Sequence, residues 1–273
     1  MDLNTITAVA RPKARDQLPV WTAGDAWLAG GTWLFSEPQA HLRRLIDLTD
    51  LKWPVLTISE TGLSIAATCT VAQLDALACP PEWIASPLIN QCCRAFLASF
   101  KICKTATVGG NICMSLPAGP MISLTSALDG MATIWPAAGG ERKIAVADFV
   151  TGDNRNVLAH GDLLRQIDIP LAALKRRSAF RQISLTQFGR SAALLIGSLS
   201  GEGALALTVT ASTTRPVQLS FAGIPTAKEL RETILQRIPD DLYHTDVHGK
   251  PAWRKHMTLR LGEEIRSELQ ALL

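Results

Sequence analysis

Two pairs of consecutive glycines carry the clearest chemical signal in this sequence. The first lies in residues 29–34, Ala-Gly-Gly-Thr-Trp-Leu, and the second in residues 107–111, Thr-Val-Gly-Gly-Asn. Glycine lets a backbone adopt positive φ angles and lets a ligand approach closely. Consecutive backbone N–H groups in such turns form a concave nest for anions. We therefore predict that the two segments enclose one diphosphate group from both sides.

Neither segment fits the common nucleotide-binding patterns. The chain has no G-x-G-x-x-G after Leu28 and no G-x-x-x-x-G-K-[ST]. Taken alone, each glycine pair is most simply a tight turn. The occurrence of both pairs, together with the residues around each, favours a binding site over two unrelated turns.

The same segments resemble motifs of one flavoprotein family. A-G-G-T-x-L at residues 29–34 and T-[IV]-G-G-N at residues 107–111 are similar to the FAD-binding subunit of molybdenum hydroxylases, the family of carbon monoxide dehydrogenase and xanthine dehydrogenase. Residues 246–256 resemble the family's D-x-H-G-x-x-x-[YW]-R-x-H signature. Further matches follow the family's order at residues 45–48, 63–67, 162–170 and 178–181.

The resemblance implies one non-covalent FAD per chain and names its contacts. From the two glycine segments these are Ala29, Gly30, Gly31, Thr32, Trp33, Leu34, Thr107, Val108, Gly109, Gly110 and Asn111. Leu164 lies where the family has an apolar contact to the flavin, and Arg181 lies where many relatives have a lysine near it. We expect an aspartate at Gly30 or Gly109 to abolish FAD binding and to leave most of the fold intact.

Several residues depart from the family pattern. Relatives often have Arg-Asn before the second glycine pair, where this chain has Cys103 and Lys104. Pro120 occupies the position of a usual aspartate, which removes a polar contact to the cofactor. Trp33 stands where smaller or polar residues are common. Tyr243 is the single tyrosine, so no tyrosine is expected to cover the isoalloxazine within the flavin domain.

The implied activity is electron transfer. No Ser/His/Asp, Cys/His or metal-ligand constellation can be assigned in the sequence, so bound flavin would supply the redox chemistry. In the family, a large subunit oxidises substrate at a molybdopterin centre, and 2Fe–2S clusters of a small subunit pass the electrons to FAD. This chain lacks a 2Fe–2S cysteine motif and is too short for the molybdopterin subunit. We therefore expect both subunits as partners.

Two alternatives stay open. An independent flavin oxidase of the vanillyl-alcohol-oxidase type would share the general fold, but it needs a substrate domain with catalytic residues and often a covalent flavin. A scaffold subunit that has lost flavin is suggested by Pro120 and by the missing Arg-Asn pair. The purified chain would be yellow with releasable FAD, yellow with covalent flavin, or colourless in the three cases.

Composition limits the class of protein. The chain has 273 residues, 47% hydrophobic and 19% charged, which predicts a sizeable core and no extensive disorder. A net charge of +3 is too small to indicate nucleic-acid or membrane-surface binding. Residues 1–15 lack the apolar core of a signal peptide, and the apolar stretch at residues 112–138 is broken by prolines and an aspartate. We expect a cytoplasmic protein without membrane insertion.

The cysteines are interpreted for a protein of the reducing cytoplasm. The 6 cysteines are expected to be reduced and mostly buried. An iron–sulfur cluster is the alternative, because several lie close together in sequence, but their spacings match none of the usual ligand runs. The cysteines are Cys69, Cys79, Cys92, Cys93, Cys103 and Cys113.

The predicted fold class is α+β. The resemblance implies a two-part FAD-binding domain of the vanillyl-alcohol-oxidase (PCMH) type at residues 1–171, with subdomains of about 1–57 and 58–171. A smaller α+β domain of the carbon monoxide dehydrogenase flavoprotein type follows at residues 172–273. Apolar patterns predict strands at residues 55–59, 63–67, 131–135, 167–169 and 204–210. Helices are predicted at residues 71–78, 87–97, 121–129, 226–236 and 251–273.

Overall fold

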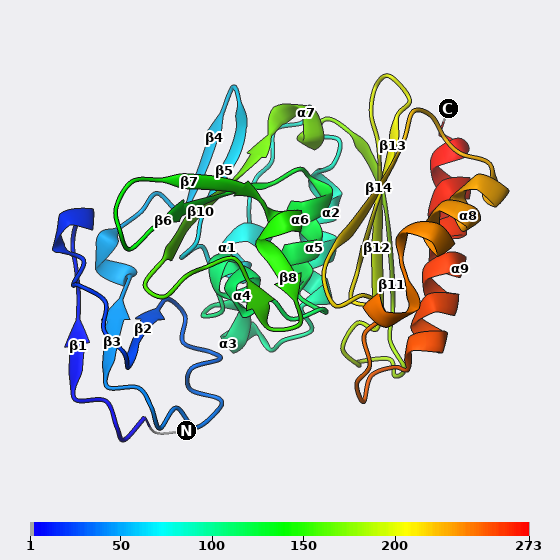
Figure 1. The fold of residues 1–273 in the computed structure, drawn as a ribbon. Helices are drawn as coiled ribbons and strands as arrows, with labels where there is room; N and C mark the ends of the chain where they lie inside the picture. The colour runs from blue at the N-terminus through cyan, green and yellow to red at the C-terminus, as the bar shows by residue number, and fades with distance from the viewer. Residues whose placement is uncertain (1–2, 273) are drawn as a thin grey trace.

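Three principal β-sheets follow one another along the molecule (Figure 1). The structure, a computed structural model, describes residues 3–272. The first sheet is parallel, with strand order β1-β3-β2, and lies at one end of the molecule. Its strands are β1 (Ala8–Ala10), β2 (Asp25–Leu28) and β3 (Arg44–Asp47).

The second sheet is antiparallel and lies in the middle. Its strand order is β4-β5-β10-β6-β7. The strands are β4 (Leu56–Ser59), β5 (Gly62–Ala66), β6 (Met131–Trp135), β7 (Arg142–Ala145) and β10 (Leu163–Pro170). A short hairpin, β8 (Val150–Gly152) and β9 (Arg155–Asn156), lies beside it.

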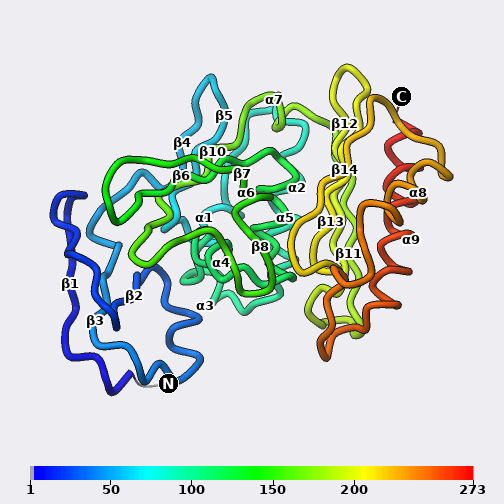
Figure 2. Tube along the Cα trace, in the orientation of Figure 1, coloured from blue at the N-terminus to red at the C-terminus, as the bar shows by residue number. Residues whose placement is uncertain are grey.

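A layer of helices separates the second sheet from the third (Figures 1 and 2). Within this layer α2 packs on α5, and α5 packs on strands of the third sheet. The helices of this part are α1 (Val71–Asp75), α2 (Ser86–Ala95), α3 (Phe100–Cys103), α4 (Val108–Met114), α5 (Pro120–Ala127), α6 (Val146–Phe149) and α7 (Leu171–Leu174). All eight residues of α5 are buried, since the third sheet and the helices α2, α4 and α6 pack around it.

The third sheet is an antiparallel meander at the C-terminal end. Its strands are β11 (Arg177–Ile183), β12 (Ala193–Leu199), β13 (Leu205–Thr210) and β14 (Val217–Phe221). Two helices, α8 (Ala227–Arg237) and α9 (Pro251–Gln270), cover its outer face. Strand β12 is buried on both faces. Leu194 and Ile196 join the core of the helical layer, while Ala193 and Leu195 join the core beneath α8 and α9.

The predicted α+β architecture is confirmed, with most elements displaced by a few residues. Strand β10 extends beyond the strand predicted at residues 167–169, and α9 ends at Gln270. Leu273, the last residue of that predicted helix, lies outside the described residues, as do Met1 and Asp2 of the predicted first domain. The predicted domain limits stay a prediction, although the second sheet ends at Pro170 and the third begins at Arg177.

The predicted list omits many of the observed elements, among them β12, β14 and α4. Remaining short helical turns are the 3-10 helices Arg15–Gln17, Thr49–Leu51 and Asp240–Leu242. Among residues 3–272, no helix combines the length and apolar character needed to cross a bilayer.

Arg254, at the start of α9, is a buried cation with 1% of its surface exposed. Its Nη1 donates to the carbonyl oxygens of Ala192 and Ala211 at 2.6 Å each, and its Nε donates to that of Gly249 at 3.1 Å. Its Nη2 pairs with the carboxylate of Asp246. These bonds tie α9 to the start of β12 and the end of β13, so the C-terminal signature has a structural role.

We predict that Arg254→Met lowers the free energy of unfolding by about 3–5 kcal/mol, because it leaves the Asp246 carboxylate and buried carbonyls without a partner. Urea denaturation followed by circular dichroism would measure the change. The neighbouring Lys255→Met is the control. Lys255 pairs with an Asp240 side chain that is 80% exposed, and such pairs contribute about 0–1 kcal/mol. Equal losses in both variants would contradict the role assigned to Arg254.

Candidate functional site

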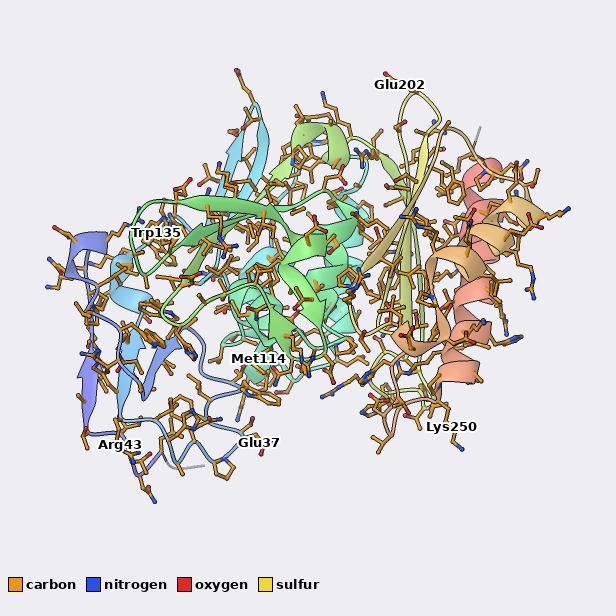
Figure 3. The ribbon with its side chains drawn as sticks, viewed as in Figure 1. Glu37, Arg43, Met114, Trp135, Glu202 and Lys250 are labelled. Carbon is orange, nitrogen blue, oxygen red and sulfur yellow. The ribbon has the colours of Figure 1, made fainter. Side chains whose placement is uncertain are left out.

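One cavity brings the two glycine segments together. It has a volume of about 500 Å³, within the usual range for ligand pockets. Three parts of the chain form its walls: the segment after β2, the region from the end of α2 to the start of α5, and the loop between β11 and β12. Met114 of α4 is one of the lining residues and is labelled in Figure 3.

Most of the predicted site residues line this cavity. They are Ala29, Gly30, Gly31, Thr32, Trp33, Leu34, Thr107, Gly110 and Asn111. Four predicted residues are absent from the lining: Val108, Gly109, Leu164 and Arg181.

Gly30 shows why the first segment needs a glycine. A Cβ atom there would lie 1.8 Å from the carbonyl oxygen of Thr105. The backbone of the first segment therefore runs directly against the chain that leads into the second. Gly31 has a φ of +68°, which L-residues rarely adopt, and a Cβ there would lie 2.5 Å from the ring of Phe35.

The first segment also presents free hydrogen-bond donors. Within residues 3–272, the backbone N–H groups of residues 30–34 donate to no acceptor. The turn is closed instead by the N–H of Phe35, which donates to the carbonyl of Gly31 at 2.9 Å. Consecutive unpaired N–H groups in residues that line a cavity suit the acceptor oxygens of a diphosphate.

The second segment differs, because it begins helix α4 and Thr107 is its N-cap. The N–H groups of residues 108–111 all donate within the chain. Their acceptors, in chain order, are the Cys69 carbonyl at 2.8 Å, the Ala67 carbonyl at 3.0 Å, the Thr107 Oγ1 at 3.0 Å and the Thr107 carbonyl at 3.0 Å. The expectation of a second backbone nest was therefore wrong, and this segment offers side chains to the cavity.

The sequence matches the family model for the FAD binding domain in molybdopterin dehydrogenase over residues 9–172. The match spans more than half of the chain. This chain belongs to that family. The predicted family is thereby confirmed, and membership makes the chain an oxidoreductase component that carries an FAD-binding domain.

Solved structures share the fold over nearly the whole chain. Reconstituted CO dehydrogenase from Oligotropha carboxidovorans has 19% identity and a TM-score of 0.78, covering 98% of this chain and 99% of that chain. Quinoline 2-oxidoreductase from Pseudomonas putida 86 has 18% identity and a TM-score of 0.76, covering 98% of each chain. At such identities the likeness shows the fold alone. A sequence comparison with curated proteins gave no match.

The FAD-binding domain uses Gly109 for packing. A Cβ at Gly109 would lie 2.5 Å from the Cβ of Ala67, beside the end of β5. Val108 is fully buried in the same core. Since Gly30 and Gly109 both face protein backbone at closer than contact distance, an aspartate at either would disturb the fold itself. The expectation that these variants keep the fold intact was wrong.

Leu164 and Arg181 are engaged elsewhere in the flavoprotein. Leu164 lies on β10 opposite Ile134 and is buried in the main core. Arg181 lies on β11 and pairs with Glu264 at 3.2 Å and with Glu268 at 2.6 Å, both on α9.

Sequence reasoning missed most of the wall opposite the first glycine segment. The additional lining residues are Trp27, Ala95, Phe96, Leu97, Ala106, Cys113, Met114, Leu116, Ala118, Gly119, Pro120, Phe188, Arg190 and Ser191. From the sequence, Pro120 was expected only to remove a polar contact to the cofactor. Its position at the start of the buried helix α5 explains why a proline is tolerated there.

The cysteines show no reactive character in this domain. Burial raises the pKa of Cys69, Cys93 and Cys113 to about 12. Such thiols remain protonated at neutral pH and are poor nucleophiles. Within residues 3–272, no group of three or more His, Cys, Asp or Glu side chains could hold a metal ion.

Asn111 joins the cavity to the start of α5. Its Oδ1 accepts a hydrogen bond from the N–H of Met121 at 3.1 Å, which replaces a missing partner at that helix end. Within residues 3–272, its amide NH₂ group donates to no acceptor. This donor is therefore available to a ligand in the cavity.

We predict that Asn111→Asp weakens FAD binding by about tenfold or more, because a carboxylate oxygen replaces the donor and repels the anionic cofactor. The variant keeps the acceptor for Met121, so its thermal stability without cofactor should match that of the original protein. Asn111→Ala is the comparison and should lose about 1 kcal/mol of stability with the helix cap. Fluorescence titration with FAD and thermal melts would measure both effects. Undiminished affinity in Asn111→Asp would remove Asn111 from the FAD site.

Proposed function

We propose that this chain binds one FAD non-covalently in the cavity and serves as the electron-transfer flavoprotein of a heteromeric molybdenum hydroxylase. The observation that carries the proposal is the row of free N–H groups at residues 30–34, in a cavity lined mostly by the matched domain. In this arrangement those groups hold the diphosphate. Thr32, Thr107 and Asn111 contribute side-chain hydrogen bonds.

The cavity suits a cofactor that brings its own chemistry. Bound FAD supplies the capacity to accept and release electrons. In the part of the chain that the structure describes, no Asp, Glu, His, Lys or Tyr lines the cavity, and thus no carboxylate, imidazole, amine or phenol is placed to act as a general base. Apolar lining residues such as Phe96, Leu97 and Met114 would hold the ring systems and exclude water. This composition supports an electron-transfer role over an independent oxidase.

Non-covalent attachment is supported by the same lining. Cys113 is its single cysteine, and burial raises the pKa of this thiol to about 12. No histidine lines the cavity. The two side chains through which flavins are commonly attached are thus absent or unreactive here.

We expect acid precipitation of the purified protein to release all yellow chromophore into the supernatant, as one FAD per chain. Chromatography of the supernatant would identify FAD and its amount. Flavin retained in the pellet would favour the independent-oxidase alternative. A colourless protein that does not take up added FAD would favour a scaffold that has lost its cofactor.

The partners are part of the proposal. We infer a small 2Fe–2S subunit that delivers electrons and a large molybdopterin subunit that oxidises the substrate, with transfer from FAD to an external acceptor. The family description and the fold shared with a chain of the Cu,Mo-CO dehydrogenase support this arrangement. The 19% identity to that chain leaves the substrate of the complex unspecified.

The isolated FAD-loaded chain should not oxidise an organic substrate at an enzymatic rate, whereas the complex with both partners should. Co-expression of the three subunits should give a stable assembly in which substrate bleaches the flavin absorbance. Omission of the 2Fe–2S subunit is the control and should abolish that bleaching. Turnover of a reduced organic substrate by the lone chain at ~1 s⁻¹ or faster would replace the electron-transfer assignment with an independent oxidase.

A further inference from the structure

Among the described residues, 3–272, Arg190 is the only charged side chain that lines the FAD cavity. It lies in the loop between β11 and β12 and is exposed. Within residues 3–272, its guanidinium forms no hydrogen bond or ion pair. Arg181, by contrast, is held by two glutamates of α9. Arg190 is thus a cation available to a bound ligand.

The backbone beside Arg190 is firmly anchored. The next residue, Ser191, is buried, and its Oγ accepts a hydrogen bond from Nε2 of Gln182 at 2.8 Å. The carbonyl of Ala192 accepts from the buried Arg254 at 2.6 Å. The guanidinium therefore extends from a fixed base, which suits a residue that must meet a ligand in a defined place.

Arg190 reaches the cavity from the side opposite the diphosphate segment. The free N–H groups follow the first sheet, whereas Arg190 belongs to the third, and these sheets lie at opposite ends of the molecule (Figures 1 and 2). FAD held by its diphosphate at residues 30–34 would extend one of its two ring systems toward Arg190.

A second cavity adjoins the first at Arg190. It has a volume of about 250 Å³ and shares Leu116, Ala118, Arg190 and Ser191 with the first cavity. The ring nearest Arg190 therefore adjoins additional open space. A redox-active ring requires such access to exchange electrons, whereas adenine does not. This favours the isoalloxazine at the Arg190 end.

We propose that Arg190 stabilises the negative charge that the isoalloxazine acquires on reduction, and so raises the affinity of the bound flavin for electrons. The inference rests on the proposed function. Two electrons from an iron–sulfur donor and one proton convert the oxidised ring to its anionic reduced form, with the proton on N5 and the charge at N1–C2=O. A guanidinium fork matches that pair of acceptors.

Sulfite titration of the FAD-loaded protein tests this charge directly. Sulfite donates its lone pair to N5, and the same negative charge then resides at N1–C2=O, which bleaches the flavin absorbance. Arg190→Gln should weaken sulfite binding by about tenfold or more, and Arg190→Lys should restore most of it. The midpoint potential of Arg190→Gln should fall by about 30 mV for each tenfold change. The dissociation constant for FAD should change by less than about threefold.

Arg237→Gln is the matched control and should keep the original sulfite affinity, since Arg237 is an exposed cation at the end of α8 and is outside the lining. Unchanged sulfite affinity in Arg190→Gln would overturn the inference. So would weaker FAD binding with unchanged sulfite affinity of the loaded variant, because Arg190 would then contact the diphosphate or adenine. If the original protein bound no FAD, the proposed function would fail as well. Loss of sulfite affinity in Arg190→Gln, with the original affinity kept in the control variant, would support both the inference and the proposed function.

Discussion

The close approach of Gly30 to the carbonyl of Thr105 is the constraint on which the site depends. A Cβ at Gly30 would lie 1.8 Å from that oxygen, so only glycine permits the contact. It places the turn after β2 against the chain that enters α4. The cavity exists because these two segments, distant in sequence, meet with no side chain between them.

The two segments that meet at this contact use their backbone N–H groups differently. The N–H groups of α4 are satisfied by carbonyls at the end of β5 and by the Thr107 cap, so they fix the helix and leave nothing for a ligand. The N–H groups of residues 30–34 have no partner within residues 3–272, and these residues line the cavity. An unsatisfied row of donors is costly when desolvated, and an anionic cofactor offsets that cost. In the proposed function, residues 30–34 would therefore bind the cofactor, while the hydrogen bonds of α4 keep the helix rigid.

The sequence singled out two segments that the structure brings to one cavity, but it did not predict how their hydrogen-bond donors differ. The two glycine pairs look alike locally, yet their donors differ because the acceptors for α4 come from Ala67 and Cys69, far back in the chain. Strand β12 was missed because both of its faces are buried, which removes the alternation typical of a strand. Arg181 and Arg190 lie nine residues apart in the sequence. Only tertiary contacts show that Arg181 is paired and that Arg190 lines the cavity. A local sequence pattern does not indicate which distant residues will become its partners.

The C-terminal signature, residues 246–256, supports one wall of the cavity through the contacts of Arg254. Arg254 does not line the FAD cavity, but it donates to the carbonyl of Ala192, where the loop bearing Arg190 returns to the sheet. The N–H of Ala192 in turn donates to the carbonyl of Ile183, which closes the base of that loop. Asp246 holds the Arg254 guanidinium in place and therefore supports the loop indirectly. The C-terminal sheet thus serves as the rigid frame from which one wall of the cavity is built, and a motif that does not line the cavity holds that wall in place.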